Sequence, residues 1–318
     1  MEKMTEKRQG HDFPLLEICD LSVSFRMYDS ALGQRDLQVI SNLSIKVDAG
    51  EILAIAGSSG SGKSLLASAI LGILPENAIV AGDVRYNGQN LTPELQEKLR
   101  GKEMALVPQS VAYLDPLMRA GAQADGHQKP RPTARRKEIF GRLGLPGNTE
   151  SFYPFQLSGG MARRVLVSTA LIADAGLIIA DEPTPGMSLD QALEALKLFR
   201  GMADDGKAVI LITHDIDLAF AFADKIAVFY AGTTVETASA LEFRTGPEAM
   251  RHPYSKALWR ALPQNGFEPI AGFQPYAGNL PRGCLFAPRC SCKSEQCEQE
   301  APPVRELRGG EVRCFYAT

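Results

Sequence analysis

The feature that most constrains this chain is the run Gly-Ser-Ser-Gly-Ser-Gly-Lys-Ser at residues 57–64. A continuous apolar stretch from Glu51 to Ala56 precedes it, and an apolar stretch with helical character from Leu65 to Leu74 follows it. Strand, glycine loop and helix in this order predict a phosphate-binding loop, whose backbone N–H groups point at phosphates. Side chains would block that approach, so glycine is needed. The alternative, a chance glycine-rich turn, does not explain the full pattern in this context.

The same loop predicts how a nucleoside triphosphate and its metal ion are bound. The ammonium of Lys63 is expected to reach the β- and γ-phosphates, and the hydroxyl of Ser64 is expected to ligate Mg²⁺. The other residues expected to contact the nucleotide are Gly57, Ser58, Ser59, Gly60, Ser61, Gly62 and Leu65.

Two acidic residues follow a second apolar strand, Leu177 to Ala180. Polar groups at the carboxyl ends of such strands meet the nucleotide. Asp181 is therefore expected to hold Mg²⁺ through water, and Glu182 is the candidate catalytic base for the attacking water. A plainer alternative is a helix N-cap ahead of Pro183.

A histidine closes a third apolar strand, Ala208 to Thr213. In that position His214 is expected to contact the γ-phosphate and to orient the catalytic water. A lone histidine is more often a surface or core residue, and this is the interpretation for His11, His127 and His252.

Alternating strands and helical patterns predict an α/β fold with a mostly parallel sheet covered on both faces. Two segments with alternating apolar residues, Ile18 to Phe25 and Leu43 to Val47, predict a β-rich N-terminal part. A helical insert is expected at about residues 110–170. Frequent Pro and Gly mark an appended region. The expected division is therefore 14–245 and 246–318.

Composition restricts the partners. The chain has 318 residues and a net charge of −3, so no basic field indicates nucleic acid. No apolar run approaches the roughly 20 residues that span a bilayer. The N-terminus lacks the apolar core of a signal peptide. The chain is expected in the cytoplasm and, if it serves a membrane, to dock on a separate membrane subunit.

Four further motifs make the chain resemble the ATPase subunits of ATP-binding cassette (ABC) transporters over residues 16–245. They are Gln109 after Val-Pro, the signature Leu-Ser-Gly-Gly-Met at residues 157–161, the Asp181-Glu182 pair, and His214. The resemblance implies an ABC-type core with a helical subdomain and an N-terminal β-subdomain, which binds ATP between two copies.

The resemblance also implies further roles. Gln109 would ligate Mg²⁺ and couple the site to the membrane subunit. Ser158, Gly159 and Gly160 would contact the γ-phosphate held by the opposing cassette. Ser188 departs from the family, which usually has an aspartate there. The aromatic residue that stacks on adenine is open between Phe25 and Tyr28.

Five of the six cysteines lie in the appended region, at positions 284, 290, 292, 297 and 314. In a reducing compartment such clustering indicates metal binding rather than disulfides. Four thiolates suit a [4Fe–4S] cluster or Zn²⁺. The lack of a Cys-x2-Cys pair disfavours a zinc ribbon, and a region without metal stays an alternative.

The appended region resembles the C-terminal region of oligopeptide, dipeptide and nickel importer ATPases, through His-Pro-Tyr-Ser at 252–255 and Gly-Cys-Leu-Phe-Ala-Pro-Arg-Cys at 283–290. Several members carry an iron–sulfur cluster there. The implied ligands are Cys284, Cys290, Cys297 and Cys314, with Cys292 able to replace Cys290.

This resemblance implies ATP hydrolysis that powers import of peptides or a chelated metal such as nickel. The implied partners are two membrane permease subunits, a second ATPase subunit of the same or a different kind, and an extracytoplasmic binding protein. The implied location is the cytoplasmic face of the membrane. A soluble ABC ATPase and a cysteine-based redox regulator are the alternatives; a single cassette without a basic patch argues against the first, and intact hydrolytic residues argue against the second.

Overall fold

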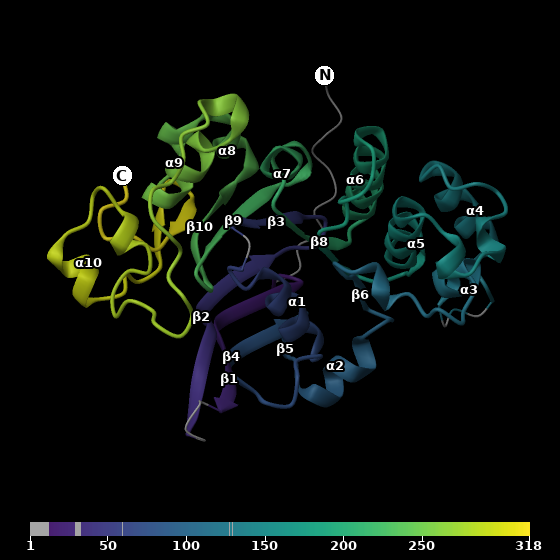
Figure 1. The fold of residues 1–318 in the computed structure, drawn as a ribbon, viewed down its shortest axis with the longest axis horizontal. Helices are drawn as coiled ribbons and strands as arrows, with labels where there is room; N and C mark the ends of the chain where they lie inside the picture. Colours follow the sequence, from purple (N-terminus) through teal and green to yellow (C-terminus); the bar gives the residue numbers. More distant parts are fainter. Residues whose placement is uncertain (1–12, 29–32, 59, 127, 129) are drawn as a thin grey trace.

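Two β-sheets organise the chain (Figure 1), and the computed structural model describes residues 13–28, 33–58, 60–126, 128 and 130–318. The larger sheet has the order β11-β12-β10-β9-β3-β8-β7-β6, and the smaller has the order β2-β1-β4-β5. The strands of the larger sheet are β3 (Ile52–Gly57), β6 (Met104–Val107), β7 (Leu177–Asp181), β8 (Ala208–Thr213), β9 (Lys225–Tyr230), β10 (Thr233–Ser239), β11 (Arg305–Leu307) and β12 (Gly310–Val312). Those of the smaller sheet are β1 (Leu16–Tyr28), β2 (Gln34–Val47), β4 (Ala78–Tyr86) and β5 (Gln89–Asn90).

The centre of the larger sheet is parallel, because β9, β3, β8, β7 and β6 pair in the same direction. Strands β3, β7 and β8 are buried along their whole length, which explains their continuous apolar runs. The predicted α/β core is confirmed, and the predicted strand Ala208 to Thr213 coincides with β8. The sequence pattern did not predict β4, whose apolar residues at 78–81 do not alternate with polar ones, or β10, which carries no continuous apolar run.

Helices cover the larger sheet and build a separate lobe. They are α1 (Lys63–Leu71), α2 (Pro93–Leu99), α3 (Ala120–Asp125), α4 (Thr133–Arg142), α5 (Gly159–Ile172), α6 (Leu189–Asp204), α7 (Ile216–Phe222), α8 (Ala240–Thr245), α9 (Pro253–Arg260) and α10 (Glu295–Gln299). Apolar residues of α1 share one core with the small sheet, and the apolar residues of α5 and α6 share the other core with the opposite face of the large sheet.

The lobe at the right of Figure 1 consists of α3, α4 and α5, inserted between β6 and β7. Buried Arg136 of α4 ties it together through ion pairs with Asp125 and, at 2.8 Å, with Glu150. Arg164 of α5 donates to the carbonyl oxygens of Leu143 at 2.9 Å and Gly144 at 2.8 Å. In the part of the chain that the structure describes, no helix is both long and apolar enough to span a membrane.

The appended C-terminal region contributes strands to the larger sheet. Strand β12 pairs antiparallel with β10, so the region extends the sheet edge at the left of Figure 1. The fully buried carboxylate of Glu236 in β10 accepts hydrogen bonds from the backbone N–H groups of Arg251 and His252, both at 2.8 Å. The Arg251 guanidinium lies 3.4 Å from Glu236 and 2.7 Å from Glu242.

His252 is a core residue, as expected from the sequence. It is buried, and its Nδ1 atom caps α9 by accepting from the N–H of Tyr254 at 3.0 Å. Burial lowers the pKa of His252 from 6.5 to about 3, because the charged imidazolium loses its hydration.

Candidate active site

The phosphate-binding loop joins β3 to α1 and encloses the side chain of Lys63. The buried Lys63 ammonium donates hydrogen bonds to the carbonyl oxygens of Gly57 and Ser58, both at 2.9 Å. Gly60 and Gly62 have φ angles of 75° and 98°, a left-handed conformation that glycine adopts without strain. The described residues of the sequence Gly-x-x-x-x-Gly-Lys-Ser thus run from the end of β3 to the start of α1, in the strand–loop–helix order that the sequence predicts.

The other loop residues differ in their surroundings. The Ser61 hydroxyl is buried and has no hydrogen-bond partner in the part of the chain that the structure describes. Leu65 lies in the first turn of α1 and packs against the core between the sheets. Ser59 lies outside the described residues.

Asp181, the last residue of β7, lies beside the start of α1. Burial raises the pKa of its carboxyl group, and a hydrogen bond with Ser64 lowers it. The Asp181 Oδ1 atom is buried without a hydrogen-bond partner among the described residues. A buried, unpaired carboxylate oxygen next to a hydroxyl is a donor set that fits Mg²⁺. The two residues predicted to bind the metal ion are thus brought together.

Lys63 shares this environment. Burial lowers the pKa of its ammonium, and the neighbouring carboxylates of Glu182 and Asp181 raise it. The ammonium and the two acids therefore form one electrostatic cluster at the carboxyl ends of β3 and β7.

Glu182 and His214 follow adjacent strands and contact each other. The His214 Nδ1 atom lies 2.8 Å from the Glu182 Oε2 atom. Glu182 has a φ angle of 49°, a conformation in which side chains other than glycine are strained. Its backbone N–H donates to the carbonyl oxygen of Ile212 in β8 at 2.9 Å. Because of its positive φ angle, the Glu182 side chain leaves the backbone in a direction that a residue in a regular strand would not have.

Gln109 lies on the surface just beyond β6, and a residue of α5 holds its backbone. The Arg163 guanidinium donates to the carbonyl oxygens of Pro108, at 3.1 Å, and of Gln109. Burial lowers the pKa of Arg163, while the carboxylates of Glu182 and Asp181 raise it. Arg163 therefore connects the helical lobe to the acidic cluster. The sequence pattern predicts no role for Arg163.

The signature residues stand at the N-terminus of α5. The Ser158 hydroxyl caps the helix by accepting from the Met161 N–H at 3.3 Å. Ser158 and Gly159 are exposed. A Cβ on Gly160 would lie 2.9 Å from the Gly186 carbonyl oxygen, so glycine is needed where the segment after Glu182 approaches the helix.

Ser188 has a local role. Its hydroxyl accepts from the Gln191 N–H at 3.4 Å, while the Gln191 side chain accepts from the Ser188 N–H at 3.2 Å, which makes a capping box for α6.

The two aromatic residues considered for stacking on adenine differ in their exposure. Phe25 packs against the core between the sheets, whereas Tyr28 is 70% exposed.

Five cysteines line one cavity of about 280 Å³ in the C-terminal region. They are Cys284, Cys290, Cys292, Cys297 and Cys314. Burial raises the pKa of the Cys284 thiol to about 11. Among the residues that the structure describes, no group of three or more histidine, cysteine or acidic side chains could hold a metal ion. The thiols thus share a cavity without forming an arranged metal centre, and the cysteine ligands stay a prediction.

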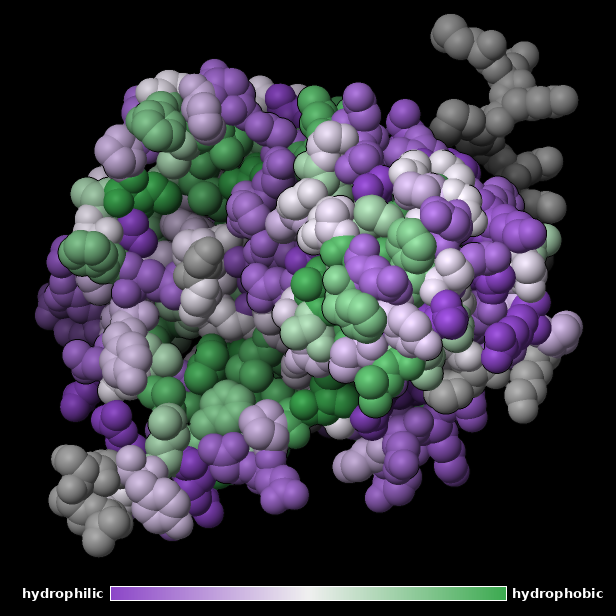
Figure 2. All heavy atoms as spheres, turned by 45° about the vertical axis from the view of Figure 1, so that its right-hand side comes forward, coloured by the Kyte–Doolittle hydropathy of each residue, from purple (hydrophilic) through white to green (hydrophobic). Residues whose placement is uncertain are grey.

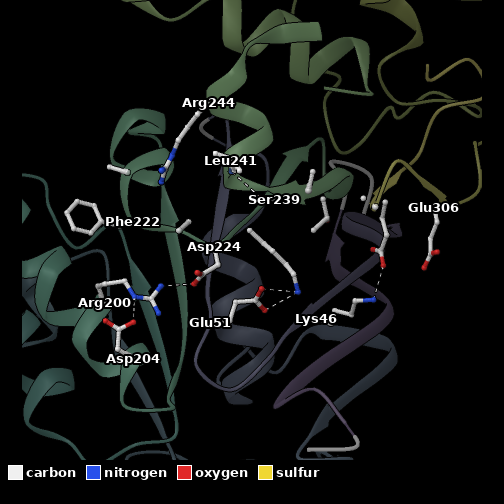
Figure 3. A pocket seen from close by; sticks show the side chains of 18 residues that line it. Lys46, Glu51, Arg200, Asp204, Phe222, Asp224, Ser239, Leu241, Arg244 and Glu306 are labelled. Atoms are coloured by element: carbon white, nitrogen blue, oxygen red, sulfur yellow. Dashed lines mark hydrogen bonds and ion pairs between the residues drawn. The ribbon is translucent and has the colours of Figure 1, made fainter. Parts of the chain in front are cut away.

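A larger cavity, of about 780 Å³, lies at the amino ends of the parallel strands, away from the motifs at their carboxyl ends (Figure 3). It adjoins the starts of β3 and β9 and the β11–β12 hairpin. Its charges are largely paired: Arg200 lies 2.7 Å from Asp224, and Lys225 lies 2.9 Å from Glu51. Because the catalytic motifs lie at the carboxyl ends of the strands, this cavity is not the predicted active site.

Comparison with known proteins agrees with this arrangement. A family model described as "ABC transporter" matches residues 40–185, and one described as "Oligopeptide/dipeptide transporter, C-terminal region" matches residues 235–297. The oligopeptide transport ATP-binding protein OppD of Escherichia coli is 33% identical over 95% of this chain and 93% of its own length. The dipeptide transport ATP-binding protein DppD of the same organism is 34% identical over 95% of this chain and 96% of its own length.

Solved structures share the fold of the core. A dimeric structure of the ATP-binding cassette MJ0796, in a post-hydrolysis state with ADP and phosphate, superposes with a TM-score of 0.62. It is 24% identical in sequence and covers 71% of this chain and 98% of its own.

Proposed function

The chain belongs to the ABC transporter ATP-binding proteins of the oligopeptide and dipeptide type, and on that premise we propose that it hydrolyses ATP to drive peptide import. The observation that carries the proposal is the Glu182–His214 pair, 2.8 Å apart beside the phosphate-binding loop. The relatives named for oligopeptide and dipeptide transport support peptides as the cargo over a nickel complex.

The loop and its neighbours are proposed to bind the nucleotide and its metal ion. Lys63 and the backbone N–H groups of residues 57–65 hold the phosphates. Ser64 and Asp181 hold Mg²⁺, with Gln109 as a further ligand. The ion neutralises negative charge on the phosphate oxygens. Tyr28 is the better candidate for stacking on adenine because its side chain is largely exposed, whereas Phe25 packs into the core.

Hydrolysis needs a base and a correctly placed water. The Glu182 carboxylate is proposed to accept the proton of the attacking water. Its short contact to His214 Nδ1 limits its rotation. The His214 side chain is 59% exposed, so its remaining ring atoms are available to the terminal phosphate. In this proposal His214 both contacts the phosphate and orients the base.

A second ATPase subunit is proposed to complete the site. Ser158 and Gly159 are exposed at a helix N-terminus, where backbone N–H groups favour an anion. Ser158 is the N-cap of α5, and Gly159 is the first residue of that helix. The proposal is that Ser158, Gly159 and Gly160 close on the γ-phosphate of the opposing subunit.

Two permease subunits and an extracytoplasmic binding protein are the other proposed partners, at the cytoplasmic face of the membrane. Exposed apolar residues support a docking surface near Gln109 and the helical lobe; they are Val111, Tyr113, Leu117 and Phe155. Figure 2, with this side turned forward, shows hydrophobic patches interrupting a mostly hydrophilic surface.

We also propose that Cys284, Cys290, Cys297 and Cys314 bind a [4Fe–4S] cluster, with Zn²⁺ as the alternative metal. The support is that these thiols line one cavity, together with Cys292. Metal binding would deprotonate the thiols and contribute folding free energy to the region proposed as 246–318, which has few regular elements. The proposed role is structural, because the catalytic proposal uses no electron transfer.

Uptake by cells tests the function. Cells that lack this chain should regain uptake of a labelled dipeptide when they express the wild-type chain, and not when they express Glu182→Gln. The complex purified from membranes should contain two membrane proteins. Unchanged peptide uptake in the deletion strain would refute peptide cargo, and a chain recovered only from the soluble fraction would favour the soluble alternatives.

A further inference from the structure

The C-terminal region reaches the phosphate-binding loop. The Ser58 hydroxyl donates a hydrogen bond of 2.6 Å to Oε1 of Gln274, a residue 216 positions away in sequence. The Tyr254 hydroxyl also lies beside Ser58: burial raises its pKa, and the side chain and backbone of Ser58 lower it. One residue of the loop is therefore held by two side chains from outside the ATPase core.

Tyr254 is a rigid anchor. Its side chain is buried, and its ring lies 4.5 Å from the ring of Tyr230 and 5.4 Å from the ring of Phe286. Tyr230 directly follows Phe229, whose carbonyl oxygen lies so near Gly57 that a Cβ there would be 2.3 Å away. The aromatic cluster and the start of the loop thus meet at the end of β9, because Gly57 of β3 pairs with Phe229 and the next residue, Tyr230, belongs to the cluster.

The segment that carries Gln274 is also fixed. The Arg289 guanidinium donates to the carbonyl oxygens of Ile270 at 3.0 Å and Ala271 at 2.8 Å. The same guanidinium donates to the Tyr230 hydroxyl at 3.4 Å. Gln274 therefore approaches Ser58 from a segment tied to the aromatic cluster.

The position of Ser58 affects the phosphate-binding lysine, because the Ser58 carbonyl accepts from Lys63 Nζ at 2.9 Å. We propose that Gln274 and Tyr254 are positioning residues that act through Ser58 to hold the loop ready for ATP. The C-terminal region then contributes directly to nucleotide affinity. This inference rests on the proposed function, since it takes the loop to be the ATP site.

The test is Gln274→Met, which keeps the length of the side chain and removes the acceptor. It should raise the Kd for a fluorescent ATP analogue with Mg²⁺ roughly fivefold, the value of one ordinary hydrogen bond. The turnover number in the assembled transporter should stay within about twofold, because the catalytic pair is unchanged. Asn279→Ala is the matched control: Asn279 is an exposed polar residue of the same segment, and its loss should leave the Kd unchanged.

A double-mutant cycle separates positioning from a general structural effect. Ser58→Ala should weaken binding like Gln274→Met, and the double variant should be no weaker than either single variant. Additive losses, or a wild-type Kd in both single variants, would overturn the inference. Failure of the wild-type chain to bind the analogue would instead refute the proposed function. Thermal unfolding of each variant shows that the fold is retained.

Discussion

The His214 Nδ1 atom lies 2.8 Å from the Glu182 Oε2 atom, although the two residues follow different strands of the parallel sheet. Neighbouring parallel strands end at the same edge, so β7 and β8 bring the carboxylate and the imidazole together. The positive φ angle of Glu182 completes the approach. The pair therefore depends on the register of two strands as much as on the residues themselves.

Glu182→Gln should bind ATP normally and reduce turnover by at least about 10²-fold, since glutamine preserves the shape and is a poor proton acceptor. Single-turnover hydrolysis in the assembled transporter is the measurement. Glu97→Gln, the same change at an exposed site on α2, should be silent. Near-normal hydrolysis by Glu182→Gln would remove this residue from the role of base.

The isolated chain should hydrolyse ATP slowly, with a specific activity that rises with protein concentration or on addition of the membrane partners. The reason is that Ser158 and Gly159 lie exposed on α5 and are proposed to serve the opposing site. Activity measured alongside light scattering tests this. A monodisperse monomer with high, concentration-independent activity would contradict the shared site.

Protein purified without oxygen should be brown and contain about four iron and four sulfide per chain, as a [4Fe–4S] cluster requires. Replacing Cys284, Cys290, Cys297 and Cys314 by serine should abolish the colour and lower the melting temperature. Cys19→Ser, which changes the one cysteine outside the cavity, is the control. Stoichiometric zinc, or a colourless wild type with unchanged stability in the serine variant, would refute the cluster.

His252 should make stability fall in weak acid. Its folded-state pKa of about 3 lies below the ordinary 6.5, so between these values only the unfolded state binds the proton. Its contribution is therefore present above pH 6.5 and is lost as the pH falls toward 3, by about 2 kcal/mol between pH 7 and pH 5.

Asparagine isolates this effect because it can still cap α9 and does not titrate. The difference in unfolding free energy between wild type and His252→Asn should shrink by that amount from pH 7 to pH 5, measured by urea denaturation. A difference independent of pH would show that His252 does not titrate as inferred.

Much of the core is predictable from the sequence, because strands buried on both faces need continuous apolar runs; β8 and β9 are the clearest cases. Strand β4 is not predictable in this way. Its residues are largely exposed or half-buried, so no hydrophobic period marks them. Gly57 to Ser64 is predictable because its chemistry demands one local pattern.

Contacts between distant segments could not be predicted. Nothing near Arg163 in the sequence shows that its guanidinium reaches the backbone of Gln109. The contact between Ser58 and Gln274 likewise depends on how the C-terminal region folds back. Ser188 shows the converse: the family pattern indicated a missing aspartate, and the structure shows a helix cap.

The buried carboxylate of Glu236 has a consequence for anyone who wishes to study the ATPase core by itself. Its charge is neutralised by Arg251, and its hydrogen bonds come from the backbone N–H groups of Arg251 and His252, all beyond residue 245. Breaking a buried ion pair costs about 3–5 kcal/mol, a large part of the stability of an ordinary domain. A fragment that ends at residue 245 would also lose the pairing of β12 with β10 and expose a strand edge prone to aggregation. The region that the sequence marks as an appendage therefore supplies the counterion of Glu236 and covers the strand edge of β10, and the core depends on it for stability.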